Sequence, residues 1–249
     1  ETGGVVVEET NSVEKSAKVT GAVTPAIGYF DDFDGNRPPS AAAYWLATTQ
    51  TGTSGTINLT SGCHWQSSST SYRFGQASTA CGGSYPVSTQ ATLSLGGNGS
   101  TPGVNGFSLP AGSSGTLKFN LWYNIEDQYD GAWLAFSTTS ASGPWTNVGD
   151  APVANAPYIS AGGYDDVLKS STTTRIWTNT STGANGSLKA VTVNLDGAAG
   201  STVWFAFKFY SDVTVTREGV YIDDVRIDVK NYASCTTNVP PPGPAARYT

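Results

Sequence analysis

The chain has 249 residues, of which 13 are basic and 19 are acidic, so its formal net charge is −6 and only 13% of its residues are charged. A soluble domain usually carries about 25% charged residues, so much of this surface must be solubilised by hydroxyl and amide groups. An acidic chain without a basic cluster is not expected to bind nucleic acid or an anionic membrane surface, and no apolar run is long enough to span a bilayer.

Two flanking segments differ in composition from the rest. Residues 1–20 contain charges but no aromatic side chain, which predicts a flexible leader. Residues 233–249 include the proline-rich run from Pro240 to Pro244, which favours a stiff, extended linker. We therefore expect one domain over residues 21–232, followed by a linker to a further region of a longer chain.

Between these flanks, the elements expected in chain order are strands. Residues 117–126 alternate apolar and polar side chains, which predicts a half-buried antiparallel strand. Residues 132–138 and the Gly-Pro turn at 143–144 predict a hairpin, and residues 188–197, 202–211 and 219–229 complete the set. No segment has a helical apolar period. The predicted fold class is all-β, a two-sheet antiparallel β-sandwich closed by its C-terminal strand.

The cysteines and glycosylation motifs favour an extracellular or cell-surface protein. Cys63 and Cys81 lie in a segment rich in Ser, Thr and Gly, where a disulfide would close a loop and contribute about 3 kcal/mol; free buried thiols are the alternative. Cys235 has no further cysteine to pair with in this pattern, and one interpretation is that its disulfide partner lies beyond this chain. The N-glycosylation sequons are at Asn58, Asn98, Asn179 and Asn185.

Common catalytic motifs are absent from the sequence. It has no H-E-x-x-H, no G-x-S-x-G, no phosphate-binding loop and no dinucleotide glycine motif. His64 is the single histidine and lies beside Cys63, so a Ser-His-Asp triad would have to use it. Paired carboxylates for glycoside hydrolysis remain an alternative. The chain is expected not to be an enzyme.

The closing strand carries an acidic residue on its apolar face. Strict alternation over residues 219–229 places Asp223 with Tyr221 and Val225, pointing inward, where an unpaired charge is costly. A cation bound to several oxygens would compensate it, and residues 31–34 offer further carboxylates, a donor set suited to Ca²⁺. Alternatively, Asp223 accepts hydrogen bonds from backbone amides or a Trp indole, or pairs with an arginine.

Two other groups of side chains are candidates for function. One is an acidic group at a strand end, for which we predict a solvated turn; its members are Glu126, Asp127 and Asp130. Aromatic residues on the more polar strand faces would stack on sugar rings or anchor a protein partner; these are Trp122, Trp204 and Tyr210. The alternative is that loops cover this face and the tryptophans belong to the core.

The order of motifs resembles the MAM-like jelly-roll modules that accompany immune inhibitor A type metallopeptidases and many bacterial surface proteins. The resemblance covers about residues 29–229. It rests on FDDFDG at 30–35, LKFNLWY at 117–123, DGAWLAFST at 130–138, VNLDGAAG at 193–200 and, above all, EGVYIDDVRI at 218–227, a phrase shared with related jelly-roll carbohydrate-binding modules.

The resemblance implies a jelly roll with a structural calcium ion and a non-catalytic role. The calcium ligands it implies are Asp32, Asp34, Glu218, Asp223 and Asp224. The implied function is recognition or adhesion, with a glycan or a cell-surface protein as the partner, beside other domains of the same chain. The alternatives are a glycoside- or polysaccharide-cleaving jelly-roll enzyme and a purely structural spacer beside a protease.

Overall fold

The computed structural model describes residues 26–34, 45–51, 57–61, 63–67, 69–75, 81, 83–96, 106–181 and 188–230. The predicted leader 1–20, the predicted linker 233–249 and Cys235 lie outside these ranges. Within them, regular structure consists of β-strands and one short 3-10 turn, Asp196–Ala198. No helix in this part of the chain is long and apolar enough to cross a membrane.

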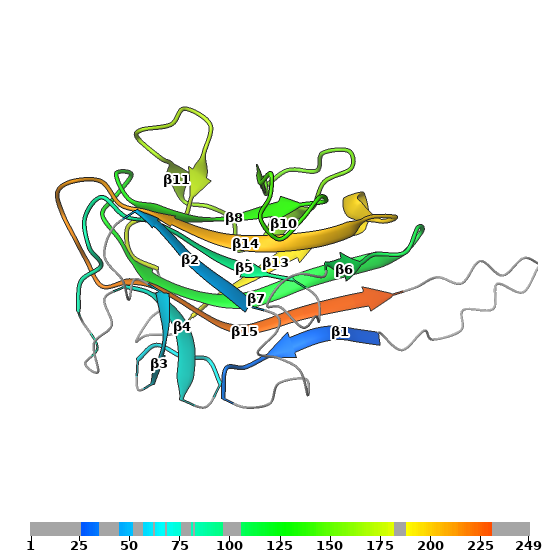
Figure 1. Ribbon diagram of the computed structural model, residues 1–249, viewed down its shortest axis with the longest axis horizontal. Helices are drawn as coiled ribbons and strands as arrows, with labels where there is room; N and C mark the ends of the chain where they lie inside the picture. The colour runs from blue at the N-terminus through cyan, green and yellow to red at the C-terminus, as the bar shows by residue number, and fades with distance from the viewer. Residues whose placement is uncertain are drawn as a thin grey trace, which may run out of the picture.

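Two antiparallel sheets build the fold (Figure 1). The first has the strand order β10-β13-β7-β15-β4-β3, with β1 beside β15. Its strands are β1 (Ala26–Asp31), β3 (Ile57–Ser61), β4 (Thr70–Phe74), β7 (Ser114–Asn124), β10 (Tyr158–Ala161), β13 (Lys189–Asn194) and β15 (Gly219–Lys230).

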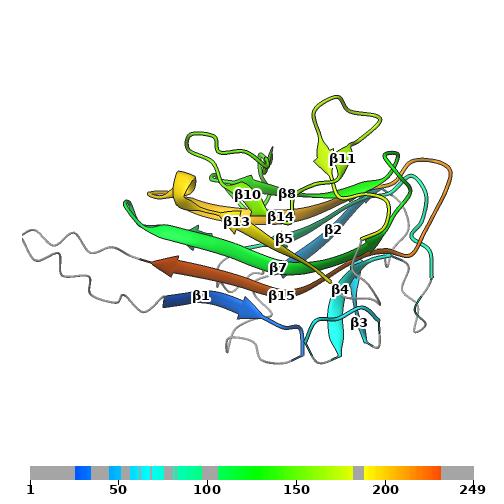
Figure 2. The same ribbon diagram turned by 180° about the vertical axis from the view of Figure 1, so that it is seen from behind.

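The second sheet has the order β2-β5-β14-β8-β9, with β6 beside β14. Its strands are β2 (Trp45–Thr51), β5 (Gln90–Leu95), β6 (Phe107–Ser108), β8 (Gly131–Ser137), β9 (Thr146–Asn147) and β14 (Thr202–Tyr210). A small hairpin of β11 (Asp166–Val167) and β12 (Arg175–Ile176) belongs to neither sheet, and Trp177, directly after β12, forms a bridge to Ala132 of β8 (Figures 1 and 2). The predicted all-β sandwich and the β8–β9 hairpin are both confirmed.

The core lies between the inner faces of β7 and β14. The alternation predicted for residues 117–126 is confirmed, because its apolar members are all buried. Phe119 of β7 meets Phe207 of β14 edge to face, with ring centroids 4.9 Å apart. Large aromatic rings that pack across the two layers in this way dominate the energy of such a core.

The alternation predicted for residues 219–229 is wrong at one point. The pairing of β15 with β7 shifts register between Asp223 and Arg226, and Asp224 has a φ of 50°. This β-bulge adds one residue to β15 and reverses which positions face inward. The residues that face the main core are Val220, Ile222, Val225 and Ile227. Asp223 is fully buried, but it lies on the outer face of the first sheet with Tyr221.

A loop closed by a disulfide covers one end of that outer face. Cys63 and Cys81 are bonded, and residues 63–67, called here the disulfide loop, lie over β7 and β15. The His64 ring stacks on the Trp122 ring with centroids 3.5 Å apart and planes 9° apart. Cys63, Trp122 and Tyr221 belong to a second, smaller hydrophobic cluster on this face.

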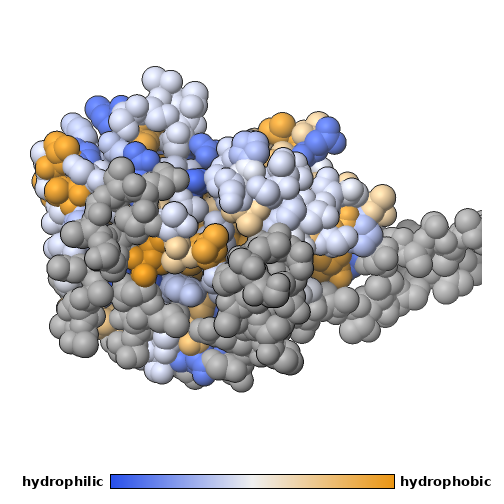
Figure 3. Space-filling view, viewed as in Figure 1, coloured by the Kyte–Doolittle hydropathy of each residue, from blue (hydrophilic) through white to orange (hydrophobic). Residues whose placement is uncertain are grey.

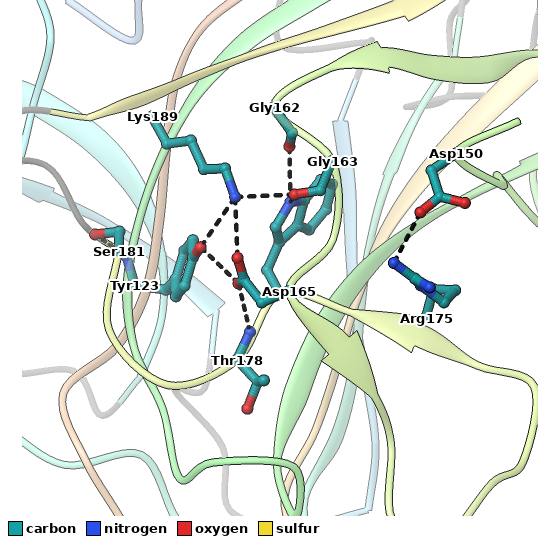
Figure 4. A network of polar contacts seen from close by, with 10 residues as sticks. Tyr123, Asp150, Gly162, Gly163, Asp165, Arg175, Thr178, Ser181 and Lys189 are labelled. Carbon is teal, nitrogen blue, oxygen red and sulfur yellow. Dashed lines mark hydrogen bonds and ion pairs between the residues drawn. The ribbon is translucent and has the colours of Figure 1, made fainter.

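A polar network fixes the segment between β10 and β12 (Figure 4). Lys189 donates to Asp165 at 3.1 Å and to the carbonyl of Gly163 at 2.9 Å, and the Tyr123 hydroxyl donates to Asp165 at 2.6 Å. The Trp177 indole donates to the carbonyl of Gly163 as well. These contacts tie Asp165 to the framework and give it a structural role.

Candidate metal centre

The structure uses the predicted acidic residues at the N-terminal strand to hold loops. Asp32 is buried and its Oδ1 accepts the backbone amide of Asp34 at 3.0 Å. Asp34 in turn accepts the amide of Ser69 through both carboxylate oxygens, at 3.1 and 3.0 Å. Hydrogen bonds from Ser69 and Thr70 lower the pKa of Asp34 against the opposing effect of burial.

The predicted pair on β15 holds the disulfide loop. Asp223 accepts the amides of Gln66 at 2.7 Å and Ser67 at 3.2 Å, and the amide of Asp224 at 2.8 Å. Asp224 accepts the Ser67 hydroxyl and the Asn120 amide group. The alternative in which backbone amides satisfy Asp223 is therefore confirmed. Burial nevertheless raises the pKa of Asp223 to about 6.

Glu218, the fifth predicted ligand, contacts His64 and Tyr221. Its Oε1 contacts His64 Nε2 at 3.1 Å and accepts the Tyr221 hydroxyl at 2.9 Å. Burial lowers the pKa of His64, although Glu218 acts in the opposite direction. All five predicted ligands belong to the described residues, and no three of their carboxylates converge within 4.8 Å of one another.

Two of the three predicted aromatic contacts are buried. Trp122 is 8% exposed beneath His64, and Trp204 is 9% exposed. Tyr210, at the end of β14, is half-buried. The alternative in which loops and packing bury the tryptophans describes this structure, so their rings do not form an open platform for a ligand.

Three other carboxylates converge at one end of the sandwich. Glu126 and Asp130 lie in the loop that carries the chain from β7 of the first sheet to β8 of the second. Asp212 lies in the β14–β15 loop, which returns the chain to the first sheet, and both loops lie at the same end (Figures 1 and 2). Their carboxylate oxygens lie within 4.8 Å of one another. We call Glu126, Asp130 and Asp212 the acidic cluster.

Asp130 is the buried centre of the acidic cluster. It is fully buried, so the prediction of a solvated turn is wrong for this residue. Its Oδ2 accepts the Tyr85 hydroxyl at 2.5 Å, and its Oδ1 accepts the backbone amide of Asp212 at 2.6 Å. Thr178 bridges the backbone carbonyls of Glu126 and Asp130, at 2.9 Å each. The loop is thus fixed with the Asp130 carboxylate facing inward.

Burial and neighbouring negative charge raise the pKa of two members of this cluster, Asp130 and Glu126. Burial raises the pKa of Asp130 to about 6, and the charges of Asp212 and Glu126 act in the same direction. Burial and Asp212 also raise the pKa of Glu126, against the attraction of Arg217. One buried carboxylate oxygen of Glu126, Oε2, has no hydrogen-bond partner among the described residues. A bound cation would compensate this charge.

The donors of the acidic cluster are oxygens alone. Carboxylate oxygens suit hard cations such as Ca²⁺, Mg²⁺ or Mn²⁺, whereas zinc sites usually include His or Cys. Each oxygen of Asp130 accepts one hydrogen bond and keeps a lone pair for a metal. The Glu126 oxygen without a hydrogen-bond partner, Oε2, could also coordinate a metal. These three residues could hold a metal ion.

Exposed apolar side chains flank the acidic cluster. Val213 and Val215 follow Asp212 in the β14–β15 loop and are 73% and 43% exposed. Val87 lies nearby, because the amide of the next residue, Ser88, donates to the carbonyl of Asp212. Figure 3 shows apolar surface at this end of the molecule. The end therefore combines buried carboxylates with apolar loop tips.

The sequence pointed to part of this cluster but not to its composition. Glu126 and Asp130 stand out as an acidic group, whereas Asp212 is isolated in the chain. The available signal is positional, since Asp130 directly precedes β8 and Asp212 closely follows β14. These two strands are antiparallel neighbours, so their adjoining ends meet at one edge. That pairing is not visible in one sequence.

Comparison with known proteins finds similarity both in sequence and in structure. No family model matches the chain. The pre-pro-metalloprotease PrtV of Vibrio cholerae is 30% identical over 121 residues, which are 49% of this chain and 11% of that protein. The chain thus spans about a tenth of the length of the curated relative it matches.

Two adhesin domains of Lys-gingipain from Porphyromonas gingivalis W83 are among the similar solved structures. The K1 cleaved adhesin domain has a TM-score of 0.42 and 16% identity, covering 83% of this chain and 98% of the adhesin domain. The K3 domain has a TM-score of 0.42 and 18% identity, covering 82% of this chain and 99% of the adhesin domain.

Proposed function

We propose that this chain is a non-catalytic, calcium-stabilised recognition or adhesion module of a larger secreted or cell-surface protein. The observation that carries the proposal is the match to a small part of a metalloprotease. A zinc protease of the H-E-x-x-H type needs two histidines in that motif, whereas this chain has only one. The chain would then correspond to an accessory region beside a catalytic domain, in the manner of MAM-like modules.

The same proposal covers the domain limits. We propose a single jelly-roll domain over residues 21–232, with the predicted flexible leader at residues 1–20 before it and the predicted proline-rich linker at residues 233–249 after it. The partner is a glycan or a cell-surface protein, together with other domains of the parent chain. A spacer role beside a protease is compatible with the same architecture and differs only in lacking a partner of its own.

An enzyme that uses paired carboxylates is less well supported. Asp130 and Asp223 are the aspartates whose pKa burial raises to about 6, the property expected of a general acid. Both side chains are fully buried and hydrogen-bonded to the protein. A polysaccharide cannot reach either carboxyl group in this structure.

We propose the acidic cluster as the calcium site. Calcium takes six to eight oxygen ligands in flexible geometry, and carboxylates from two loops suit it better than the strict octahedron of magnesium. The full chain should therefore melt at a higher temperature in CaCl₂ than in EDTA. At a free Ca²⁺ concentration about 100 times its Kd, the gain is about 2.7 kcal/mol, or roughly 5 to 10 °C.

Variants locate the ion. Asp212→Asn should abolish the calcium-dependent rise in melting temperature, because the amide cannot supply a charged ligand. Asp127→Asn is the matched control, since Asp127 lies exposed in the same loop as Glu126 and is not one of the converging carboxylates. A calcium response that survives Asp212→Asn, or an equal response to MgCl₂, would contradict the assignment.

A further inference from the structure

A groove runs along β7 on the outer face of the first sheet, starting where the disulfide loop ends. It consists of two adjoining hollows of about 440 and 330 Å³, and Lys118 lines both of them. The β7 residues that line it with their outward side chains are Ser114, Thr116, Lys118 and Asn120. Strands β13 and β15 flank it on either side. We call this feature the sheet groove.

The strand register arranges the groove's side chains in rows. The central row crosses four strands and contains Thr192, Lys118, Arg226 and Phe30. The next row along β7 contains Asn194, Thr116 and Asp228. Rows two residues apart along a strand are about 7 Å apart. The groove therefore offers a regular series of contacts to an extended ligand.

The central row places two positive charges side by side. Lys118 pairs directly with Arg226 across the β7–β15 ladder, and like charges in that position destabilise a sheet. Arg226 is offset by Asp228, which accepts its Nε at 2.8 Å. Lys118 is exposed and has no hydrogen-bond or ion-pair partner among the described residues. An anionic group bound beside Lys118 would relieve this repulsion.

The rows beside the central one supply groups suited to hydroxyls. The bulge on β15 brings Asp224 to the outer face, where Asn120 donates to it at 3.2 Å. Fixed carboxylate and amide groups of this kind accept and donate hydrogen bonds with neutral hydroxyls. Phe30 is half-buried at the side of the groove, and its ring offers an apolar face of the kind that packs on sugar C–H groups.

We infer that the sheet groove binds an anionic oligosaccharide, with the carboxylate or sulfate of one sugar unit held between Lys118 and Arg226. The inference rests on the recognition role proposed above. An extended peptide is a poorer occupant, because peptides add to the edge of a sheet through backbone hydrogen bonds, and this groove lies on a face.

Titration calorimetry on the full chain tests this site. The probes are hexagalacturonate for the carboxylate, a heparin-derived hexasaccharide for the sulfate and neutral cellohexaose. We expect at least one anionic probe to bind about tenfold or more tightly than cellohexaose, with an affinity that falls as salt is added. Lys118→Ala should weaken that binding by about tenfold or more, whereas the matched exposed lysine variant Lys169→Ala should leave it unchanged.

The controls separate this inference from the proposed function. Lys118→Ala removes a side chain without a described partner, so its melting temperature should equal or exceed that of the unmodified chain. Failure of both anionic probes to bind at about 1 mM would overturn the inference, as would equal binding of cellohexaose or no effect of Lys118→Ala. The calcium-dependent melting of the same sample reports on the acidic cluster, which shares no residue with the groove.

Discussion

Protonation of Asp130 couples the acidic cluster to pH. Its pKa rises to about 6 in the folded protein because the side chain is buried beside other carboxylates, whereas an unfolded aspartate has a pKa of about 3.9. Below about pH 4 the carboxyl is protonated in both states. As the pH rises from about 4 to about 6, the carboxyl ionises more readily in the unfolded chain than in the folded protein, so the free energy of unfolding falls, by roughly 3 kcal/mol over the whole range.

We therefore expect the melting temperature in EDTA to be higher at about pH 5 than at about pH 7. Asp223 has a similarly raised pKa and contributes in the same direction. Asp130→Asn should remove the part of the pH dependence that comes from Asp130, and Asp223→Asn should remove the part that comes from Asp223. Saturating CaCl₂ should remove the Asp130 part as well, because the ion stabilises the charged carboxylate. A pH dependence left intact by Asp130→Asn would show that this carboxyl is not the titrating group.

At the scale of single elements, the contrast between β7 and β15 shows what a period of two can predict. In β7 Leu117, Phe119, Leu121 and Tyr123 follow that period, and the structure buries them as expected. In β15 the period predicts an inward Asp223, but the bulge before Arg226 turns it outward. A bulge is a change in pairing between two strands, so the sequence of β15 alone does not contain it. The prediction that Asp223 points into the core depended on strict alternation through that position.

The disulfide loop is the second element whose position the sequence left open. Spacing predicted the Cys63–Cys81 bridge as a loop closure, and the structure forms it. What the loop covers depends on contacts between distant segments, because Trp122 and Asp223 both lie beneath it. The tryptophan predicted to meet a ligand is therefore a buried support for the loop.

Removing the bridge should destabilise the domain and loosen the loop. The bridge spans 18 residues, and closing a loop of that size contributes about 3 kcal/mol. We expect the double variant Cys63→Ser with Cys81→Ser to lose that amount in urea unfolding. Its tryptophan fluorescence should shift to longer wavelength before the main transition, as water reaches Trp122. Cys235→Ser, which leaves the bridge intact, is the control; equal stability of the two variants would contradict the assigned role.

In the whole molecule, the acidic cluster and the sheet groove occupy separate regions. The cluster lies where two crossover connections pass between the sheets, whereas the groove lies on the outer face of one sheet. A cation at the cluster would join the β7–β8 and β14–β15 loops, and thereby both layers. Ion binding is thus expected to act on global stability, and ligand binding in the groove to act locally.

Hydrogen exchange followed by mass spectrometry can test this division. Calcium should slow exchange in residues 125–131 and in residues 211–218 together, because each loop supplies part of the cluster. Exchange in residues 114–120 of the groove should change only as much as the global stability does. An anionic hexasaccharide should instead slow exchange in residues 114–120 and leave exchange in the two loops unchanged. If the ion joins the two loops, Asp212→Asn should abolish the calcium-dependent protection in both of them. Protection confined to one loop would show that the ion does not join them.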